Sequence, residues 1–315
     1  MYNNYHINFL VENIYLALQL INFFMKKITL LLITVFTVNF AFSQFYISAS
    51  GGYTIPSTGV KFGETITSTT SESNYGSYGE GSNGQLRFGY SINDTFGVEL
   101  GFGYLHGADQ TIDKVNLPDQ EVDIKARGRA FGVLPQLTYR FDNHFYGRIG
   151  ALLKVGGKTE ALIYNKSTLD NDSATALGLP SGAYTVVDAT IAYHGQLPLG
   201  VVAAMGYKVS LGGNWSLFTE FEYMGVSVKR KNSEIAAMAG GVFLSNGTQI
   251  MPFDMNNLPT GWEAQTEYVD ELPTSMLQAN GGSTFPAKKL SEKVPYSSFG
   301  INFGITYTFS KKNIE

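Results

Sequence analysis

Histidine and serine are the residue types in this chain that could support nucleophilic catalysis. A serine hydroxyl becomes reactive when a base lies within hydrogen-bonding reach of it. Of the four histidines in the sequence, three follow residue 43: His106, His144 and His194. None of them forms a His-x-Ser pair on a predicted strand, and the many serines lie mainly in segments expected to be loops. The spacing therefore gives no catalytic dyad, and we predict that the chain is not an enzyme.

Metal and nucleic-acid chemistry is equally weak in the sequence. Asp170-Asn171-Asp172 and the acidic segment 107–124 carry oxygen ligands, but neither has the glycine and terminal glutamate of a calcium loop. We expect no metal site and no cofactor. The net charge is −4 and cysteine is absent, which argues against a nucleic-acid partner and excludes disulfides. The short basic runs Lys229-Arg230-Lys231 and Lys288-Lys289 suit contact with lipopolysaccharide phosphates instead.

A third group of chemically active residues recurs at alternate positions of extended segments, opposite an apolar face. Residues two apart on a strand share a face, so these charges are predicted to point together into an interior. Buried charges are costly unless they are paired, and we therefore predict ion-pair networks that fill this interior. Register across tight turns places Glu220 opposite Gly206 and diagonal to Lys208, and Arg87 diagonal to Glu99. The full set is Arg87, Glu99, Arg140, Arg148, Lys154, Lys208, Glu220 and Glu222.

Eight alternating segments must position these residues. Tight turns are predicted at 93–95, 142–144 and 212–214, and long loops at 56–82, 107–124, 158–193 and 230–292. Short turns and long loops thus alternate along the chain, as an up-and-down barrel requires. The last loop could add a hairpin and raise the strand count from eight to ten. The alternative is a soluble β-sandwich, which would bury the aromatic side chains in a core.

Aromatic residues form two groups on the apolar face. Phe96 and Trp215 lie beside tight turns, whereas Tyr104 and Tyr223 lie farther along the same strands. Their separation suits the roughly 9–11 residues with which a tilted strand crosses a bilayer. The pattern predicts two aromatic girdles at the membrane interfaces.

The final strand, 299–309, shows strict alternation between large apolar residues and small uncharged ones. Asn302, Gly304, Tyr307 and Phe309 fit a polar-x-Gly-x-x-aromatic-x-aromatic pattern. Over residues 44–309 the chain resembles small bacterial outer-membrane β-barrel proteins of the OmpA-like or OmpW-like kind, in which this pattern is read by the barrel-assembly machinery during insertion. The family usually ends on the aromatic residue, whereas here a short periplasmic tail, 310–315, follows. The resemblance implies an all-β, eight-stranded antiparallel up-and-down transmembrane β-barrel in the outer membrane with periplasmic termini.

The N-terminal region reads as a secretion signal. Residues 25–43 combine a basic start, an apolar stretch and a small-x-small cleavage site before Gln44. The apolar stretch is shorter than the roughly 20 residues of a spanning helix. Residues 1–24 precede this signal, and we expect translation to start at Met25.

Three functional hypotheses are open at this point. The first is a non-enzymatic barrel that anchors long surface loops, with a role in envelope integrity or in binding an unknown surface ligand through 107–124, 158–193 and 230–292. The second is a small channel for ions or apolar solutes. The third, by analogy with lipid A-modifying barrels of this kind, is an outer-membrane enzyme that uses His106 or His194 at the outer rim. In each case the surrounding partners would be outer-membrane lipid and lipopolysaccharide.

Overall fold

The computed structural model describes residues 44–57, 59–273 and 287–309. The predicted upstream segment 1–24, signal peptide 25–43 and tail 310–315 lie outside these residues. The described chain is almost entirely β-structure, with one short helix, α2 (Asn171–Ala176). No helix in these ranges is both long and apolar enough to cross a membrane. Residues Phe45–Thr308 form one compact unit.

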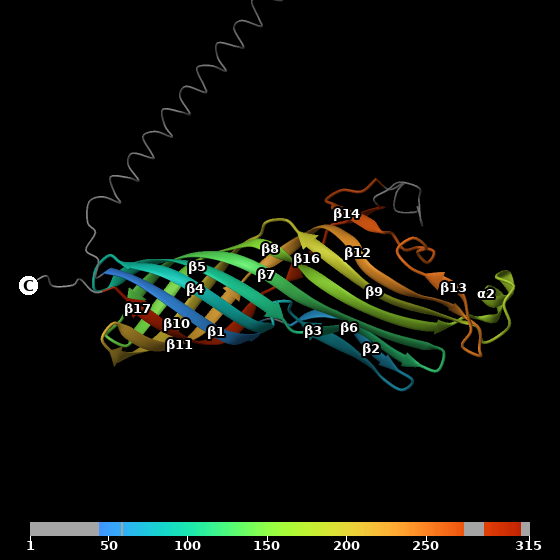
Figure 1. Cartoon of the computed structure of the whole chain (residues 1–315), viewed down its shortest axis with the longest axis horizontal. Helices are drawn as coiled ribbons and strands as arrows, with labels where there is room; N and C mark the ends of the chain where they lie inside the picture. Colours follow the sequence, from blue (N-terminus) through green and yellow to red (C-terminus); the bar gives the residue numbers. More distant parts are fainter. Residues whose placement is uncertain (1–43, 58, 274–286, 310–315) are drawn as a thin grey trace, which may run out of the picture. The chain divides into compact units, whose positions relative to one another are not determined.

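Eight strands of this unit close into a hydrogen-bonded ring (Figure 1). They are β1 (Phe45–Pro56), β4 (Gly81–Ser91), β5 (Phe96–Gly107), β7 (Gln120–Arg140), β8 (Phe145–Thr168), β10 (Leu199–Gly212), β11 (Trp215–Gly225) and β17 (Ser298–Thr308). Every neighbouring pair is antiparallel, and β17 joins β1 from Tyr46↔Thr308 to Pro56↔Ser298. The closed ring leaves no unpaired sheet edge over this stretch. These strands are the eight alternating segments predicted from the sequence.

Local chemistry explains the tight turns of the ring. The Asn93 side chain accepts hydrogen bonds from the backbone N–H groups of Thr95 and Phe96, at 2.9 and 2.7 Å. The Asp142 carboxylate does the same for His144 and Phe145. Such side-chain oxygens fix a turn by taking up its free N–H groups. The third hairpin closes through Gly212 and Gly213, whose φ angles of +94° and +60° favour glycine.

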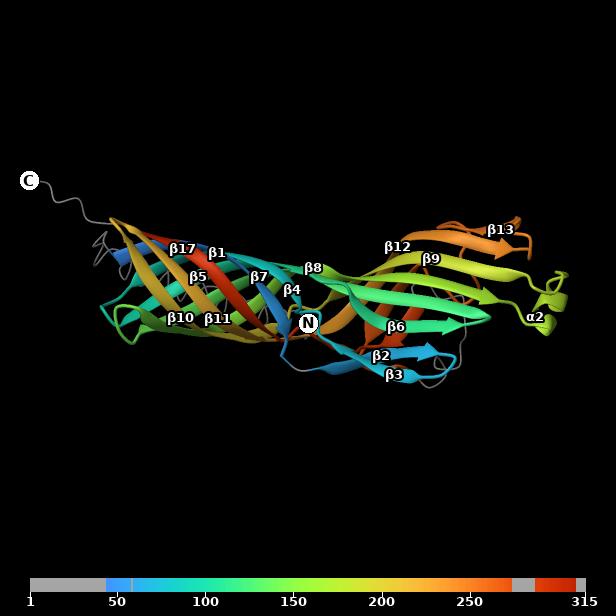
Figure 2. The same ribbon diagram turned by 90° about the horizontal axis from the view of Figure 1, so that it is seen from below.

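The segments predicted as long loops contain strands, so their assignment as loops is wrong over those stretches. The strands outside the ring are β2 (Val60–Thr67), β3 (Ser71–Gly76), β6 (Gln110–Leu117), β9 (Tyr184–Gly195), β12 (Ser227–Phe243), β13 (Gln249–Phe253), β14 (Gln265–Val269), β15 (Ala287–Leu290) and β16 (Lys293–Pro295). Among the described residues they do not enter the ring, which stays at eight strands. Figure 2 shows the same elements from a second side.

Two ring strands explain this extra sheet. β7 has 21 residues and β8 has 24, and they remain paired as far as Gln120↔Ser167. At about 3.3 Å per residue, β7 alone is roughly 70 Å long. β9 pairs with the distal part of β8, β12 pairs with β9, and β6 pairs with the distal part of β7. Much of the chain between ring strands is therefore held in a ladder.

Candidate functional site

A buried network of charges crosses the interior of the ring. Arg148 on β8 places its Nη2 atom 2.6 Å from Glu220 Oε2 and 3.0 Å from Glu222 Oε2, both on β11. Arg87 on β4 approaches the same Glu220 oxygen at 2.8 Å. Arg87 is 2% exposed and Glu220 1%. Side chains from β4 and β8 thus contact one carboxylate on β11.

Further groups complete this network. Glu99 lies 3.9 Å from Arg87 Nε and 3.7 Å from Arg148 Nη1. Gln85 donates to Glu222 at 2.7 Å, and Asn302 donates to the same carboxylate at 3.2 Å. Charge-assisted hydrogen bonds of this kind offset part of the cost of removing carboxylates from water. Arg87 approaches Glu99 diagonally, as predicted. Glu220 makes its ion pairs with Arg87 and Arg148, on strands that do not neighbour β11.

Two tyrosines belong to the network and were missing from the predicted set. Tyr46 donates its hydroxyl to Glu99 at 2.9 Å, and Tyr146 donates to Glu220. The aromatic ring of each tyrosine fills the space left by a glycine on the neighbouring strand. A Cβ at Gly89 would overlap Tyr46 Cζ, and a Cβ at Gly206 would overlap Tyr146 Cζ. An inward tyrosine paired with an inward glycine was the sequence signal that could have identified them.

The other three predicted network residues lie apart from these ion pairs. Arg140 stands at the turn end of β7, where it donates to the backbone carbonyls of Asn93 and Asp94 at 3.4 and 3.3 Å. Lys208 on β10 lies over the ring of Tyr46, with its Nζ 5.8 Å from the centroid. Lys154 lies farther along β8 than Arg148 and contacts a different part of the interior. The stagger of neighbouring strands sets these different heights, and alternation alone does not reveal it.

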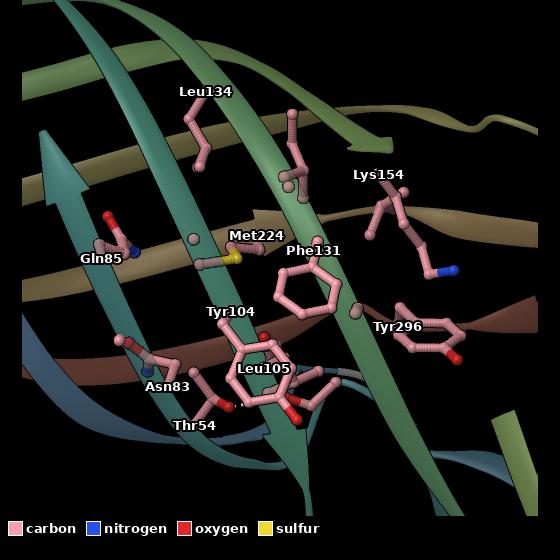
Figure 3. A pocket seen from close by; sticks show the side chains of 18 residues that line it. Thr54, Asn83, Gln85, Tyr104, Leu105, Phe131, Leu134, Lys154, Met224 and Tyr296 are labelled. Carbon is pink, nitrogen blue, oxygen red and sulfur yellow. Dashed lines mark hydrogen bonds between the residues drawn. The ribbon is translucent and has the colours of Figure 1, made fainter. Parts of the chain in front are cut away.

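Beyond the charges, the interior opens into an apolar chamber (Figure 3). Leu134 and Leu152 project into it from β7 and β8, and both are buried. Gly103 and Gly132 are register partners on β5 and β7. Their missing side chains leave this part of the wall bare. Including its open mouth, the chamber has about 570 Å³ of space that no protein atom fills.

Polar groups are few on the chamber wall. The Lys154 ammonium reaches it beside the Tyr296 ring, with 5.8 Å between Nζ and the ring centroid (Figure 3). Asn83 also lines the chamber, and neither of its side-chain polar atoms has a hydrogen-bond partner. A cationic group at one point of an otherwise apolar wall gives the chamber an amphipathic character.

Tyr296 lines the chamber at the end farther from the Arg148–Glu220 network and packs against Tyr78. Tyr78 and Tyr296 are 5% and 4% exposed, and their ring centroids are 5.7 Å apart. Both segments are held by backbone bonds, from Tyr78 N–H to the Pro295 carbonyl at 3.0 Å and from Tyr296 N–H to the Val226 carbonyl at 3.0 Å. The Tyr296 and Thr159 hydroxyls are hydrogen-bonded at 2.6 Å. The chamber thus lies between this tyrosine pair and the charge network.

The residues of the predicted assembly signal have structural contacts of their own. Asn302 is fully buried and bonds Glu222, and a Cβ at Gly304 would overlap Phe218 Cζ. Tyr307 packs against Trp215 with 4.8 Å between ring centroids. Phe309 directly follows β17. Packing alone thus explains part of this pattern.

The histidines lie in separate places. His106 contacts Tyr104, His144 stacks on Tyr207, and His194 lies 3.8 Å from Glu234. Within the described ranges no three potential metal ligands cluster together. The basic residues expected at the outer rim are partly neutralised: Lys229 pairs with Asp270, Arg230 with Glu292 and Lys288 with Glu267.

Comparisons with known proteins give distant structural likeness only. No family model matches the chain, and no curated protein matches it. Among solved structures it is similar to outer membrane protein AlkL in lipid bilayers, at 14% identity over 88% of this chain and 96% of that one, with a TM-score of 0.34. Acinetobacter baumannii CarO2 aligns at 11% identity over 84% and 99%, with a TM-score of 0.28. A Pseudomonas aeruginosa FadL homologue aligns at 11% identity over 84% and 90%, with a TM-score of 0.21.

Proposed function

We propose that the chain is an eight-stranded outer-membrane β-barrel that admits small apolar solutes into its interior chamber. The observation that carries this proposal is the chamber itself, which is lined by Leu134, Leu152 and bare glycine backbone between the tyrosine pair and the charge network. A barrel that served only as an anchor could fill this space with side chains, as small barrels usually do.

The outward face of the ring supports a membrane location. Phe303, Leu217 and Ile149 are 66%, 47% and 63% exposed, and large apolar side chains recur at alternate positions around all eight strands. Soluble proteins rarely expose apolar patches beyond a few hundred Å². A closed ring with this surface suits acyl chains, because neighbouring strands are hydrogen-bonded to one another all the way around it. Outer-membrane lipid and lipopolysaccharide would be its surroundings, the barrel-assembly machinery would insert it, and its termini would be periplasmic.

The charge network argues against an open ion pore. Arg87, Arg148 and Glu220 meet across the interior, so a hydrated ion would have to displace paired charges. The apolar-solute form of the channel hypothesis is therefore favoured over the ion form.

Surface binding is the second candidate function, and the sheet outside the ring favours it. β9 and β12 pair over most of their length and carry their own apolar cluster, which includes Val187, Ile235 and Met238. A sheet built in this way can present a binding surface, and it adds to the chamber function without replacing it.

Blocking the chamber tests the proposal. Gly103→Leu introduces a side chain whose Cβ has ordinary contacts, 3.4 Å from Leu134 and 3.6 Å from Gln85, and whose branches enter the chamber. Ala203→Leu places a leucine on the outward face of β10 instead and serves as the control. Cells expressing the wild-type chain should take up the apolar fluorophore N-phenylnaphthylamine faster than cells without it. Gly103→Leu should abolish this gain and Ala203→Leu should keep it; equal uptake by both variants would refute the proposal.

A further inference from the structure

The chamber contains one strongly polar feature that an apolar-solute function does not require. Lys154 projects from β8 onto a wall that includes the apolar side chains of Leu134, Leu152 and Met224. Its neighbour on the adjacent strand is Gly132, so no side chain from that position shields it. A lysine on such a wall is costly, because an ammonium group removed from bulk water needs a compensating charge.

No such charge is supplied by the described part of the chain. Lys154 is 9% exposed, yet no carboxylate of the described residues lies within ion-pairing distance of it. The interior carboxylates Glu220 and Glu222 are already engaged: Glu222 accepts from Arg148, Gln85 and Asn302, and Glu220 pairs with Arg87 and Arg148. The aromatic face of Tyr296 at 5.8 Å offers a weaker attraction than an anion.

We infer that Lys154 is the head-group site for an amphipathic monoanion, a carboxylate with an aliphatic or aromatic body that fills the chamber. This inference rests on the proposed function and names its ligand class. The apolar body would replace water against Leu134 and Leu152, and the carboxylate would pair with the ammonium group. A neutral solute would gain only the first contribution, and a cationic amphiphile would meet like charge.

Three ligands with the same eight-carbon tail separate these contributions: octanoate, octanol and octylammonium. Their binding to the purified full chain in lipid nanodiscs can be measured by calorimetry, with empty nanodiscs subtracted. A charge-assisted contact is worth about 1.5–3 kcal/mol, which corresponds to about tenfold or more in affinity. Octanoate should therefore bind at least about tenfold more tightly than octanol, and octylammonium should bind least.

Two substitutions assign the preference to Lys154. Lys154→Met should reduce octanoate affinity to the level of octanol and leave octanol unchanged, and Lys154→Arg should restore the preference. Lys166→Met is the matched control, because Lys166 lies on the same strand and also stands over a tyrosine, with its Nζ 5.0 Å from the Tyr184 ring. Lys166 does not line the chamber. The Lys166→Met variant should therefore bind octanoate as the wild type does.

The outcomes distinguish this inference from the function on which it rests. Equal binding of octanoate and octanol, unchanged in Lys154→Met, would overturn the head-group assignment and leave the apolar chamber standing. Tightest binding of octylammonium would overturn the assignment as well. If none of the three ligands binds, the proposed chamber function itself fails.

Discussion

Removing Arg148 is the sharpest test of the interior network. Its guanidinium lies 2.6 Å from Glu220, 3.0 Å from Glu222 and 3.7 Å from Glu99. Two arginines and three glutamates give this network a net charge of −1, and Arg148→Met changes it to −2. Breaking a buried ion pair from one side costs about 3–5 kcal/mol, because a charge is left without compensation. The folded-to-unfolded ratio should therefore fall by about two to three and a half powers of ten.

The measurement is urea unfolding in detergent or lipid, followed by tryptophan fluorescence and by the heat-dependent gel mobility typical of β-barrels. Arg127→Met is the matched control, since Arg127 pairs with Glu160 at 2.9 Å while its side chain is 30% exposed. Ion pairs that water reaches contribute about 0–1 kcal/mol. If Arg148→Met is no more destabilising than Arg127→Met, the interior is hydrated and the argument for a closed network is wrong.

A compensating change strengthens the test. Arg148→Met combined with Glu222→Gln removes one surplus carboxylate and returns the network to a net charge of −1. The double variant should be more stable than Arg148→Met alone, because glutamine has nearly the same size as glutamate and carries no charge. A further loss of stability in the double variant would mean that the charges do not act as one network.

Other parts of the molecule give three further predictions. Phe303→Lys places a charge on the outward face and should destabilise the lipid-embedded protein by about 2–4 kcal/mol, measured by unfolding in bilayers; a neutral effect would contradict the membrane assignment. Tyr307→Ala should lower the fraction of heat-modifiable protein in the membrane without changing its synthesis, if the terminal pattern directs assembly. The backbone N–H groups of Phe145 and His144 hold the pKa of Asp142 below its usual value, so its stabilising effect is present above the unfolded pKa and is lost as the pH falls through the folded pKa. Wild-type stability should therefore decrease below about pH 4, and Asp142→Ala should show a flatter acid profile.

The ring was predictable because each of its strands carries a strong local signal. Alternation from Phe299 to Phe309 and the side-chain chemistry of the turns at Asn93 and Asp142 give strand and hairpin positions directly. Membrane-spanning strands need apolar residues on one face, and this requirement produces alternation of apolar and polar residues in the sequence.

The outer sheet was not predictable by the same means. β6 (Gln110–Leu117) is intermediate or exposed at every position, so its two faces do not differ enough to produce alternation. β12 pairs with β9 through contacts distant in sequence and contains two register irregularities. Such ladders depend on pairing partners rather than on a local pattern.

The sequence predicts which residues of the site face inward but not which of them contact one another. Alternation placed Glu220 and Arg148 on inward faces, but their contact depends on the stagger between β8 and β11, which are separated by β10. Lys154 lies on the same inward face of β8 as Arg148 and is a cation like it. Only the three-dimensional arrangement separates Lys154 from Arg148 and gives it an apolar neighbourhood.

β7 and β8 run from the ring into the outer sheet with one register shift, between Phe131 and Gly132, and this course has a mechanical consequence. A flexible surface loop absorbs a pull at its tip by changing its own torsion angles, whereas a continuous hydrogen-bonded ribbon transmits that force along its length. A protein that binds the hairpin between β6 and β7 and pulls on it would therefore transmit force along β7 to the region of Leu134 and Leu152. A mechanical load on the outer sheet would reach the bare-walled part of the lumen along these two strands.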